Sequence, residues 1–228
     1  MGNEIIRNIK YLWDSILENV YPKEDKCPIC NSYIDEGEML CRNCRCKIKF
    51  CKSNIKISKS NYEFICYSTA YYSDIIMELV VKLKYKSEFI CGEILSMLMA
   101  DYIKSRKIDF DFITFVPLSD KSFKLRGYNQ SEVLAKELSK NTGKPVLKCL
   151  KKISETKDQI GLDEKNRWLN LSKCFCANLK ITKKYIGKVI LIVDDVITTG
   201  ATSFYCAEAL KKAGAKDVFI LTAAKSKI

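Results

Sequence analysis

The chain has 228 residues, of which 47% are hydrophobic, so it can bury a core of ordinary size and is not expected to be disordered. No apolar run approaches the roughly 20 residues of a membrane helix, and charged residues interrupt the N-terminal apolar positions, so we expect a cytoplasmic protein without membrane insertion. The absence of histidine excludes Ser-His and Cys-His catalytic pairs, while the net charge of +12 favours a polyanionic partner or reflects a lysine-rich solvated surface.

Composition divides the chain into three predicted parts. Residues 1–22 are expected to form an amphipathic N-terminal helix, because apolar residues recur at helical spacing up to Pro22. Residues 23–60 contain few large apolar residues and cannot bury a core of their own. Residues 61–228 carry longer apolar segments and are expected to form the main domain.

Two C-x-x-C pairs stand in the part that lacks a core. Four thiolates at this spacing can converge tetrahedrally on one ion, and without histidine a soft metal site must use cysteine. We therefore predict a structural Zn²⁺ site, with an iron–sulfur cluster as the minor alternative. The predicted ligands are Cys27, Cys30, Cys41 and Cys44. Cys46 and Cys51 could replace one of them, and the six cysteines beyond are expected to be small buried hydrophobes.

Beyond residue 60, predicted strands and helices alternate, and the strands are apolar throughout. This pattern is typical of an α/β fold with an open, mainly parallel sheet and helices on both faces. Strands are expected at 62–72, 112–116, 188–193 and 218–223, and helices at 74–86, 88–105, 129–141 and 202–213.

The end of the first of these helices carries three lysines around Tyr85. Lys82, Lys84 and Lys86 could pair with the phosphates of single-stranded nucleic acid while Tyr85 stacks on a base. Alternatively, these residues could form an ordinary solvated helix end. The sequence leaves both interpretations open.

A basic segment follows the strand at 112–116. Pro117 and Leu118 lead into a predicted loop at 119–126, and a capped helix start comes next. Backbone amides at a turn with flanking cations suit a diphosphate group. The candidate diphosphate-binding residues are Pro117, Leu118, Lys124, Arg126, Asn129 and Gln130.

The strand ending at Val193 is followed by two carboxylates and then by a threonine- and glycine-rich helix start. Asp194 and Asp195 can accept hydrogen bonds from sugar hydroxyls, and they stand where ligands of open α/β folds bind. Amides and hydroxyls at the start of a helix form an anion site. Together they predict a ribose 5-phosphate site, whose phosphate-binding residues are Thr198, Thr199, Gly200, Ala201 and Thr202.

The run from Ile192 to Thr202 resembles the phosphoribosyl diphosphate signature of type I phosphoribosyltransferases, and the whole chain resembles the ComF family of competence proteins. The resemblance implies a phosphoribosyltransferase-like domain behind a zinc module, with Mg²⁺ bound together with phosphoribosyl diphosphate. A further stretch resembles the family's T-x-x-Q-x-x-L…R-x-x-N…F pattern and implies a mobile cover over the site. Its residues are Thr156, Gln159, Leu162, Arg167, Asn170 and Phe175. Arg167 joins Asp194 and Asp195 as a candidate catalytic residue.

Three functions remain open at the level of sequence. The protein could transfer a phosphoribosyl group in natural competence and DNA uptake, or bind single-stranded DNA alongside other proteins of the transformation machinery. It could also sense phosphoribosyl diphosphate without turnover, since a fold and its ligand do not fix a reaction. No residue identifies an acceptor.

Overall fold

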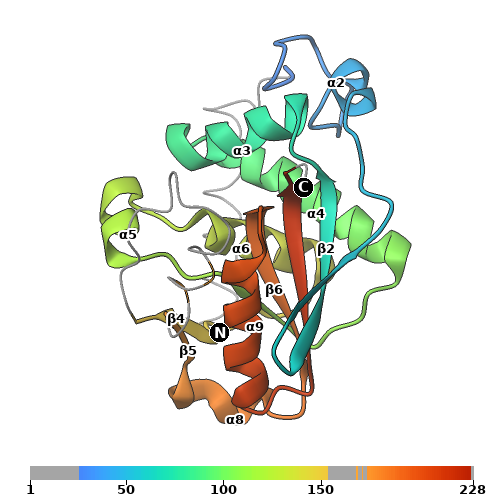
Figure 1. The fold of residues 1–228 in the computed structure, drawn as a ribbon. Coiled ribbons are helices and arrows are strands. Elements are labelled where there is room, and N and C mark those ends of the chain that lie inside the picture. Colours follow the sequence, from blue (N-terminus) through green and yellow to red (C-terminus); the bar gives the residue numbers. More distant parts are fainter. Residues whose placement is uncertain (1–25, 154–167, 169–170, 172–173, 227–228) are drawn as a thin grey trace, which may run out of the picture. The chain divides into compact units, whose positions relative to one another are not determined.

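The computed structural model describes residues 26–153, 168, 171 and 174–226 (Figure 1). Its contacts divide the chain into two compact units, Met1–Arg45 and Cys46–Ile228, whereas the sequence-based division placed boundaries at residues 22 and 60. In the described part of the chain, no helix is both long enough and apolar enough to cross a membrane.

The described part of the first unit consists of tight turns and one short helix. Lys26 forms an antiparallel bridge with Tyr33, and Asn31 adopts a positive φ of 58° in the turn between them. The second turn leads into α2 (Arg42–Cys46). Leu40 is the large aliphatic residue buried here, so apolar packing contributes little to holding these turns together.

The second unit is built on a five-stranded sheet. Its order is β1-β2-β7-β6-β3, with β1 antiparallel to β2 and every other pair parallel. The strands are β1 (Ile55–Lys59), β2 (Tyr62–Tyr71), β3 (Phe112–Phe115), β6 (Val189–Ile197) and β7 (Asp217–Lys225). The predicted mainly parallel sheet is confirmed.

Helices cover both faces of this sheet, as the apolar strands predicted. The longer helices are α3 (Asp74–Lys86), α4 (Phe89–Arg106), α6 (Gln130–Thr142) and α9 (Ala201–Lys212). In β6, Ile190 and Ile192 belong to one core cluster with Phe204 of α9. Leu191 and Val193 point to the opposite face and are also fully buried, on the side of the sheet where α4 and α6 contact the strands (Figure 1).

Smaller elements complete the second unit. Helix α5 (Asp120–Arg126) follows β3, and a separate antiparallel pair is formed by β4 (Leu150–Lys152) and β5 (Phe175–Ala177). A 3-10 turn (Leu179–Ile181) and α8 (Thr182–Tyr185) then lead to β6.

Two local predictions need correction. The segment at 119–126 is the helix α5 rather than a loop, because Ser119 caps it by accepting a hydrogen bond from Ser122 N and Gly127 ends it at a φ of 77°. The strand predicted to stop at Val193 continues to Ile197, because β7 provides hydrogen-bonding partners beyond the two aspartates.

Candidate functional site

A cavity of about 1060 Å³ lies in the second unit, and several stretches of chain line it. They include the end of α3, the stretch from Val116 to Ser131, the pair β4 and β5, and the stretch from Asp194 to Ser203, and Tyr72 and Leu171 also line the cavity. The stretches at 116–131 and 194–203 both follow parallel strands, and the carboxyl ends of such strands meet at one edge of a sheet. The topology therefore brings the two predicted site segments to a common cavity.

The two aspartates lie where β6 extends past its shorter neighbour. The last residue of β3 to pair with β6 is Phe115, opposite Val193, and Pro117 follows soon after. On the other side β6 remains paired with β7, with Asp194 opposite Thr222. The acidic pair is thus held in place by β7 on one side. On the other side β3 has already ended, and the aspartates face the cavity there.

Hydrogen bonds fix both carboxylates. Asp194 Oδ1 accepts from Ser131 Oγ at 2.8 Å and from the Asp195 amide at 2.9 Å. Asp195 Oδ1 accepts from the Val196 amide at 2.7 Å. Burial, together with the charge of Asp195, raises the pKa of Asp194 to about 7, against the opposing effects of Ser131, the Asp195 amide and Lys84.

Lys84 pairs with the second aspartate, a contact that the sequence did not predict. Its Nζ lies 2.9 Å from Asp195 Oδ2, and the two side chains are only 23% and 6% exposed. Burial disfavours the ammonium form, but the Asp195 carboxylate more than compensates, so the pKa of Lys84 is raised. Lys82 pairs with Glu78 and Glu88, so the three lysines suggested for nucleic acid do not form one solvated patch.

The predicted phosphate loop is a helix start facing the same cavity. All residues from Thr198 to Ser203 line it, and the first-turn amides of α9 have no carbonyl partners within the helix. Gly200 has a φ of 79°, and a Cβ there would lie 2.8 Å from Ile57 Cδ1 of β1. The backbone conformation therefore favours glycine, and any larger residue would also have to displace the Ile57 side chain behind it.

The basic side of the cavity comes from α5 and the start of α6. Lys121 and Arg126 line it together with Pro117, Leu118 and Gln130. Arg126 donates to Gln130 Oε1 at 3.1 Å and lies over the Tyr85 ring at 5.4 Å, so its guanidinium is held in place. Lys124 and Asn129 are not among the lining residues. Asn129 instead caps α6 and donates to the Val116 carbonyl oxygen at 2.9 Å.

The predicted cover falls mostly outside the described residues. Thr156, Gln159, Leu162, Arg167 and Asn170 all lie there. The strands β4 and β5 stand on either side of this stretch in sequence, and Lys152, Leu171 and Phe175 contribute to the cavity wall. Lys152 and Ser131 were not singled out from the sequence, because no local motif distinguishes them from surface or helix residues.

In the first unit, the four predicted metal ligands come together. The sulfur atoms of Cys27, Cys30, Cys41 and Cys44 all lie within 4.8 Å of one another. A tetrahedral ion with zinc–sulfur bonds of about 2.3 Å would hold its sulfurs about 3.8 Å apart, so the set fits. The hydrogen bond between Cys30 and Ser32 is the main cause that lowers the pKa of the exposed Cys30 thiol to about 6, whereas burial raises the pKa of the Cys44 thiol. In the described residues, neither Cys46 nor Cys51 belongs to this group.

Five of the six cysteines beyond the module are buried as predicted. Cys66, Cys91, Cys149, Cys174 and Cys206 are buried, and Cys176 is half-buried. Burial raises the pKa of the Cys66 thiol to about 12 and that of Cys149 to about 11, which keeps them protonated and unreactive.

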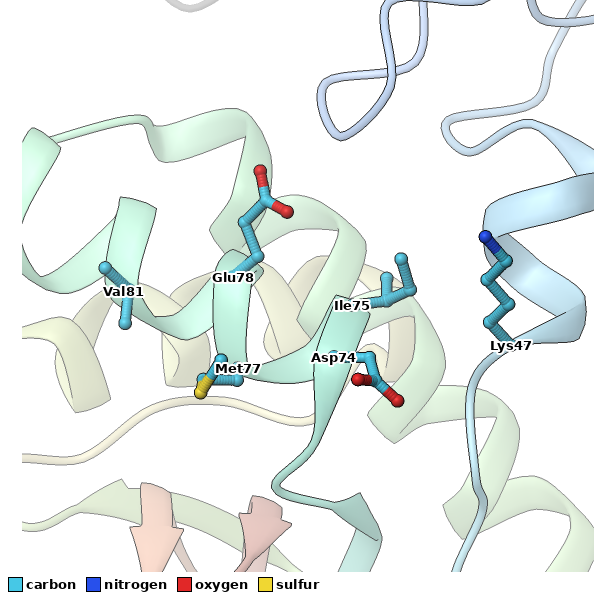
Figure 2. A pocket seen from close by; sticks show the side chains of 6 residues that line it. All are labelled: Lys47, Asp74, Ile75, Met77, Glu78 and Val81. Carbon is cyan, nitrogen blue, oxygen red and sulfur yellow. The ribbon is translucent and has the colours of Figure 1, made fainter.

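A second hollow of about 510 Å³ runs along α3. It is lined by Lys47, Asp74, Ile75, Met77, Glu78 and Val81 (Figure 2). Figure 2 shows these side chains pointing in different directions, with Lys47 facing the helix from a separate segment. No set of polar groups converges on a common point there, so the larger cavity is the candidate site.

Comparison with known proteins finds a domain match and similar competence proteins. Residues 126–227 match the model of the phosphoribosyl transferase domain. The open parallel sheet, its acidic pair and this match define a phosphoribosyltransferase-like domain. The chain is 27% identical over 207 residues to competence protein ComFC of Streptococcus pneumoniae, covering 90% of this chain and 82% of that one. The chain is thus similar over most of its length to a competence protein of the ComF family. Competence protein F of Haemophilus influenzae is 29% identical over 155 residues, covering 65% and 67% of the two chains.

Among solved structures, the glutamine phosphoribosylpyrophosphate amidotransferase from B. subtilis matches with a TM-score of 0.42 and 21% identity. The match covers 63% of this chain and 30% of the amidotransferase.

Proposed function

We propose that this competence protein binds phosphoribosyl diphosphate in the cavity of its second unit. The supporting observation is that two carboxylates, a helix start rich in threonine and a basic helix line one cavity. The carboxylates suit ribose hydroxyls, the amides and hydroxyls at 198–202 suit the 5-phosphate, and Lys121 and Arg126 suit the diphosphate. Transfer of the phosphoribosyl group would need an acceptor as well.

Mg²⁺ would be carried by the ligand in this proposal. Asp194 and Asp195 are the acids among the described lining residues, and Asp195 is already paired with Lys84. This donor set fits a metal held by the diphosphate oxygens of the ligand rather than by the carboxylates of the protein. When bound, Mg²⁺ would neutralise the diphosphate and stabilise its departure.

A thermal-shift titration tests the proposed ligand. Mg²⁺–phosphoribosyl diphosphate at 100 times its Kd should stabilise the wild type by about 2.7 kcal/mol, a rise in Tm of roughly 5–10 °C for a domain of this size. Asp194→Asn combined with Asp195→Asn should abolish most of that rise. The control combines Asp109→Asn with Asp217→Asn, whose side chains are well exposed. An equal shift in all three proteins would place the ligand elsewhere.

We also propose that the cysteine cluster holds one structural Zn²⁺. Support comes from the four converging sulfurs and from the scarcity of apolar residues in the first unit. With four protein ligands no coordination position is left for catalysis, so the ion would act on folding alone.

A further inference from the structure

Lys84 reaches the acidic pair from outside the segments that the sequence assigned to the site. It belongs to the last turn of α3, and its Nζ lies 2.9 Å from Asp195 Oδ2. Of the three lysines near this end of α3, Lys84 is the one that lines the cavity. Lys82 is occupied by Glu78 and Glu88, and Lys86 is exposed.

Within the described part of the chain, the two aspartates receive hydrogen bonds from neutral donors and a single contact from a charged group. The Oδ1 atoms of Asp194 and Asp195 accept hydrogen bonds from Ser131 and from backbone amides, which carry no net charge. Asp195 Oδ2 is buried and accepts no hydrogen bond from the described residues, so Lys84 is its compensating contact. Removing Lys84 would leave a buried carboxylate without a cation, which is strongly unfavourable.

Asp194 differs from Asp195 in that no lysine contacts its Oδ2 atom in the described residues. Its Oδ2 accepts no hydrogen bond from any residue that the structure describes, and Asp194 lines the cavity. The pair therefore presents an available acceptor beside an ammonium group that is already in place. A divalent cation approaching the pair would meet the positive charge of Lys84, whereas a sugar hydroxyl would not.

We propose that Lys84 is a positioning residue that acts as the resident cation of the acidic pair. It holds Asp195 in place for the sugar hydroxyls and takes the position that a divalent ion would otherwise fill. The inference rests on the proposed function, which it extends: the sugar phosphate half of the ligand is bound without metal at the acids. Ribose 5-phosphate, which has no diphosphate, should therefore bind equally well with and without Mg²⁺.

Calorimetric titration with ribose 5-phosphate tests this role. Lys84→Met should weaken binding by about tenfold or more, since a buried Asp195 carboxylate that has lost its cation is no longer held in place for the sugar hydroxyls. Lys84→Arg should restore affinity to within about threefold, because the charge is retained. Lys86→Met, an exposed neighbour in the same turn, should bind as the wild type does. A Lys84→Met variant that binds as tightly as Lys86→Met would overturn the inference.

Mn²⁺ binding, followed by electron paramagnetic resonance without sugar, gives a readout that a merely structural lysine would not change. The wild type should show no Mn²⁺ bound at the acids, and Lys84→Met should gain a site that is lost again in Lys84→Met/Asp195→Asn. Mn²⁺ bound equally by the wild type and Lys84→Met would contradict the proposed exclusion.

If Lys84→Met does not fold, Asp195→Asn is compared with Lys84→Met/Asp195→Asn, where no buried carboxylate is left uncompensated. If Lys84 acts through Asp195, its replacement causes no further loss of affinity in the Asp195→Asn background, whereas an additive loss would refute an action through Asp195.

Different results would overturn the two proposals. A wild type that binds neither ribose 5-phosphate nor phosphoribosyl diphosphate overturns the proposed function. Binding that is sensitive to Asp194→Asn but not to Lys84→Met overturns only the role of Lys84.

Discussion

Asp194 makes the stability of the second unit depend on pH. Its pKa is raised from 3.8 to about 7, so between these values the folded chain retains a proton that the unfolded chain has released. The free energy of unfolding therefore falls as pH rises from about 4 to about 7 and then levels off. Asp194→Asn removes this penalty while its Oδ1 can still accept from Ser131. We expect the variant to be more stable than the wild type at pH 8, by on the order of 2 kcal/mol, and to lose that advantage near pH 4.

Chemical denaturation at a series of pH values measures this difference. Asp109→Asn serves as the control, because the Asp109 side chain is 95% exposed. An advantage of Asp194→Asn that stays constant from pH 5 to pH 8 would show that Asp194 does not titrate in that window.

Gly200 offers a second test at the scale of one residue. Gly200→Ala should destabilise the protein by about 1–2 kcal/mol and weaken phosphate binding, because alanine disfavours a φ of 79° and its Cβ would meet Ile57 at 2.8 Å. Gly143→Ala is the matched control, with a φ of 70° and no atom within 4 Å of the added Cβ.

Thermal unfolding of the two variants separates the contact from the backbone effect. The excess loss in Gly200→Ala should shrink when Ile57→Val removes the terminal methyl group. Equal losses in the Gly200 and Gly143 variants would mean that β1 does not constrain the phosphate loop.

At the scale of elements, Asn129 connects the end of β3 to the start of α6. Its Oδ1 accepts from the Ser131 and Glu132 amides, and its Nδ2 donates to the Val116 carbonyl oxygen. Asn129→Ala should cost about 2 kcal/mol of stability, since it removes a helix cap and leaves a buried carbonyl oxygen unpaired. Urea denaturation measures the loss. Asn141→Ala, at the exposed end of the same helix, should cost much less, and similar losses in both would contradict a connecting role.

The elements that periodicity predicts are those that bury a full face. The predicted helices at 74–86 and 202–213 and the strand at 62–72 are confirmed within one residue at each end, because their apolar spacing directly reflects the packing. Strand β1 was missed because Ile57 is its only buried residue, and a short edge strand with so little burial has no apolar pattern. The early end given to β6 has a different cause: pairing with β7 lies far away in sequence and cannot be seen at Asp194.

In the candidate site too, local segments can be recognised from the sequence, whereas contacts between distant segments cannot. Residues that act as a contiguous segment, such as Thr198 to Thr202, could be recognised together, and the structure brings them to the cavity. Lys84 and Ser131 contact the acids from separate helices. Their contribution depends on the tertiary arrangement alone, which no local motif encodes.

At the scale of the whole molecule, the two units should respond differently to loss of metal. Chelation of Zn²⁺ is expected to unfold the first unit, whose described part has little apolar burial, while the core of the second unit contains no predicted metal ligand. Limited proteolysis should then cut between residues 26 and 45, and the thermal shift caused by phosphoribosyl diphosphate should persist.

Metal analysis of variants checks which cysteines hold the ion. Cys44→Ser should lower bound zinc well below one ion per chain, whereas Cys46→Ser should leave it unchanged. Loss of zinc in Cys46→Ser would instead assign the fourth ligand to that residue.

The placement of β1 has a consequence for how the protein can be divided. This strand is the antiparallel edge of the sheet, and its Ile57 lies directly behind Gly200. A fragment beginning at Asn61 would keep every residue proposed to touch the ligand, yet it would expose the edge of β2 to intermolecular pairing and remove the support behind the phosphate loop. The smallest fragment that binds as the whole chain does should therefore begin ahead of Ile55, near the boundary between the two units at Cys46.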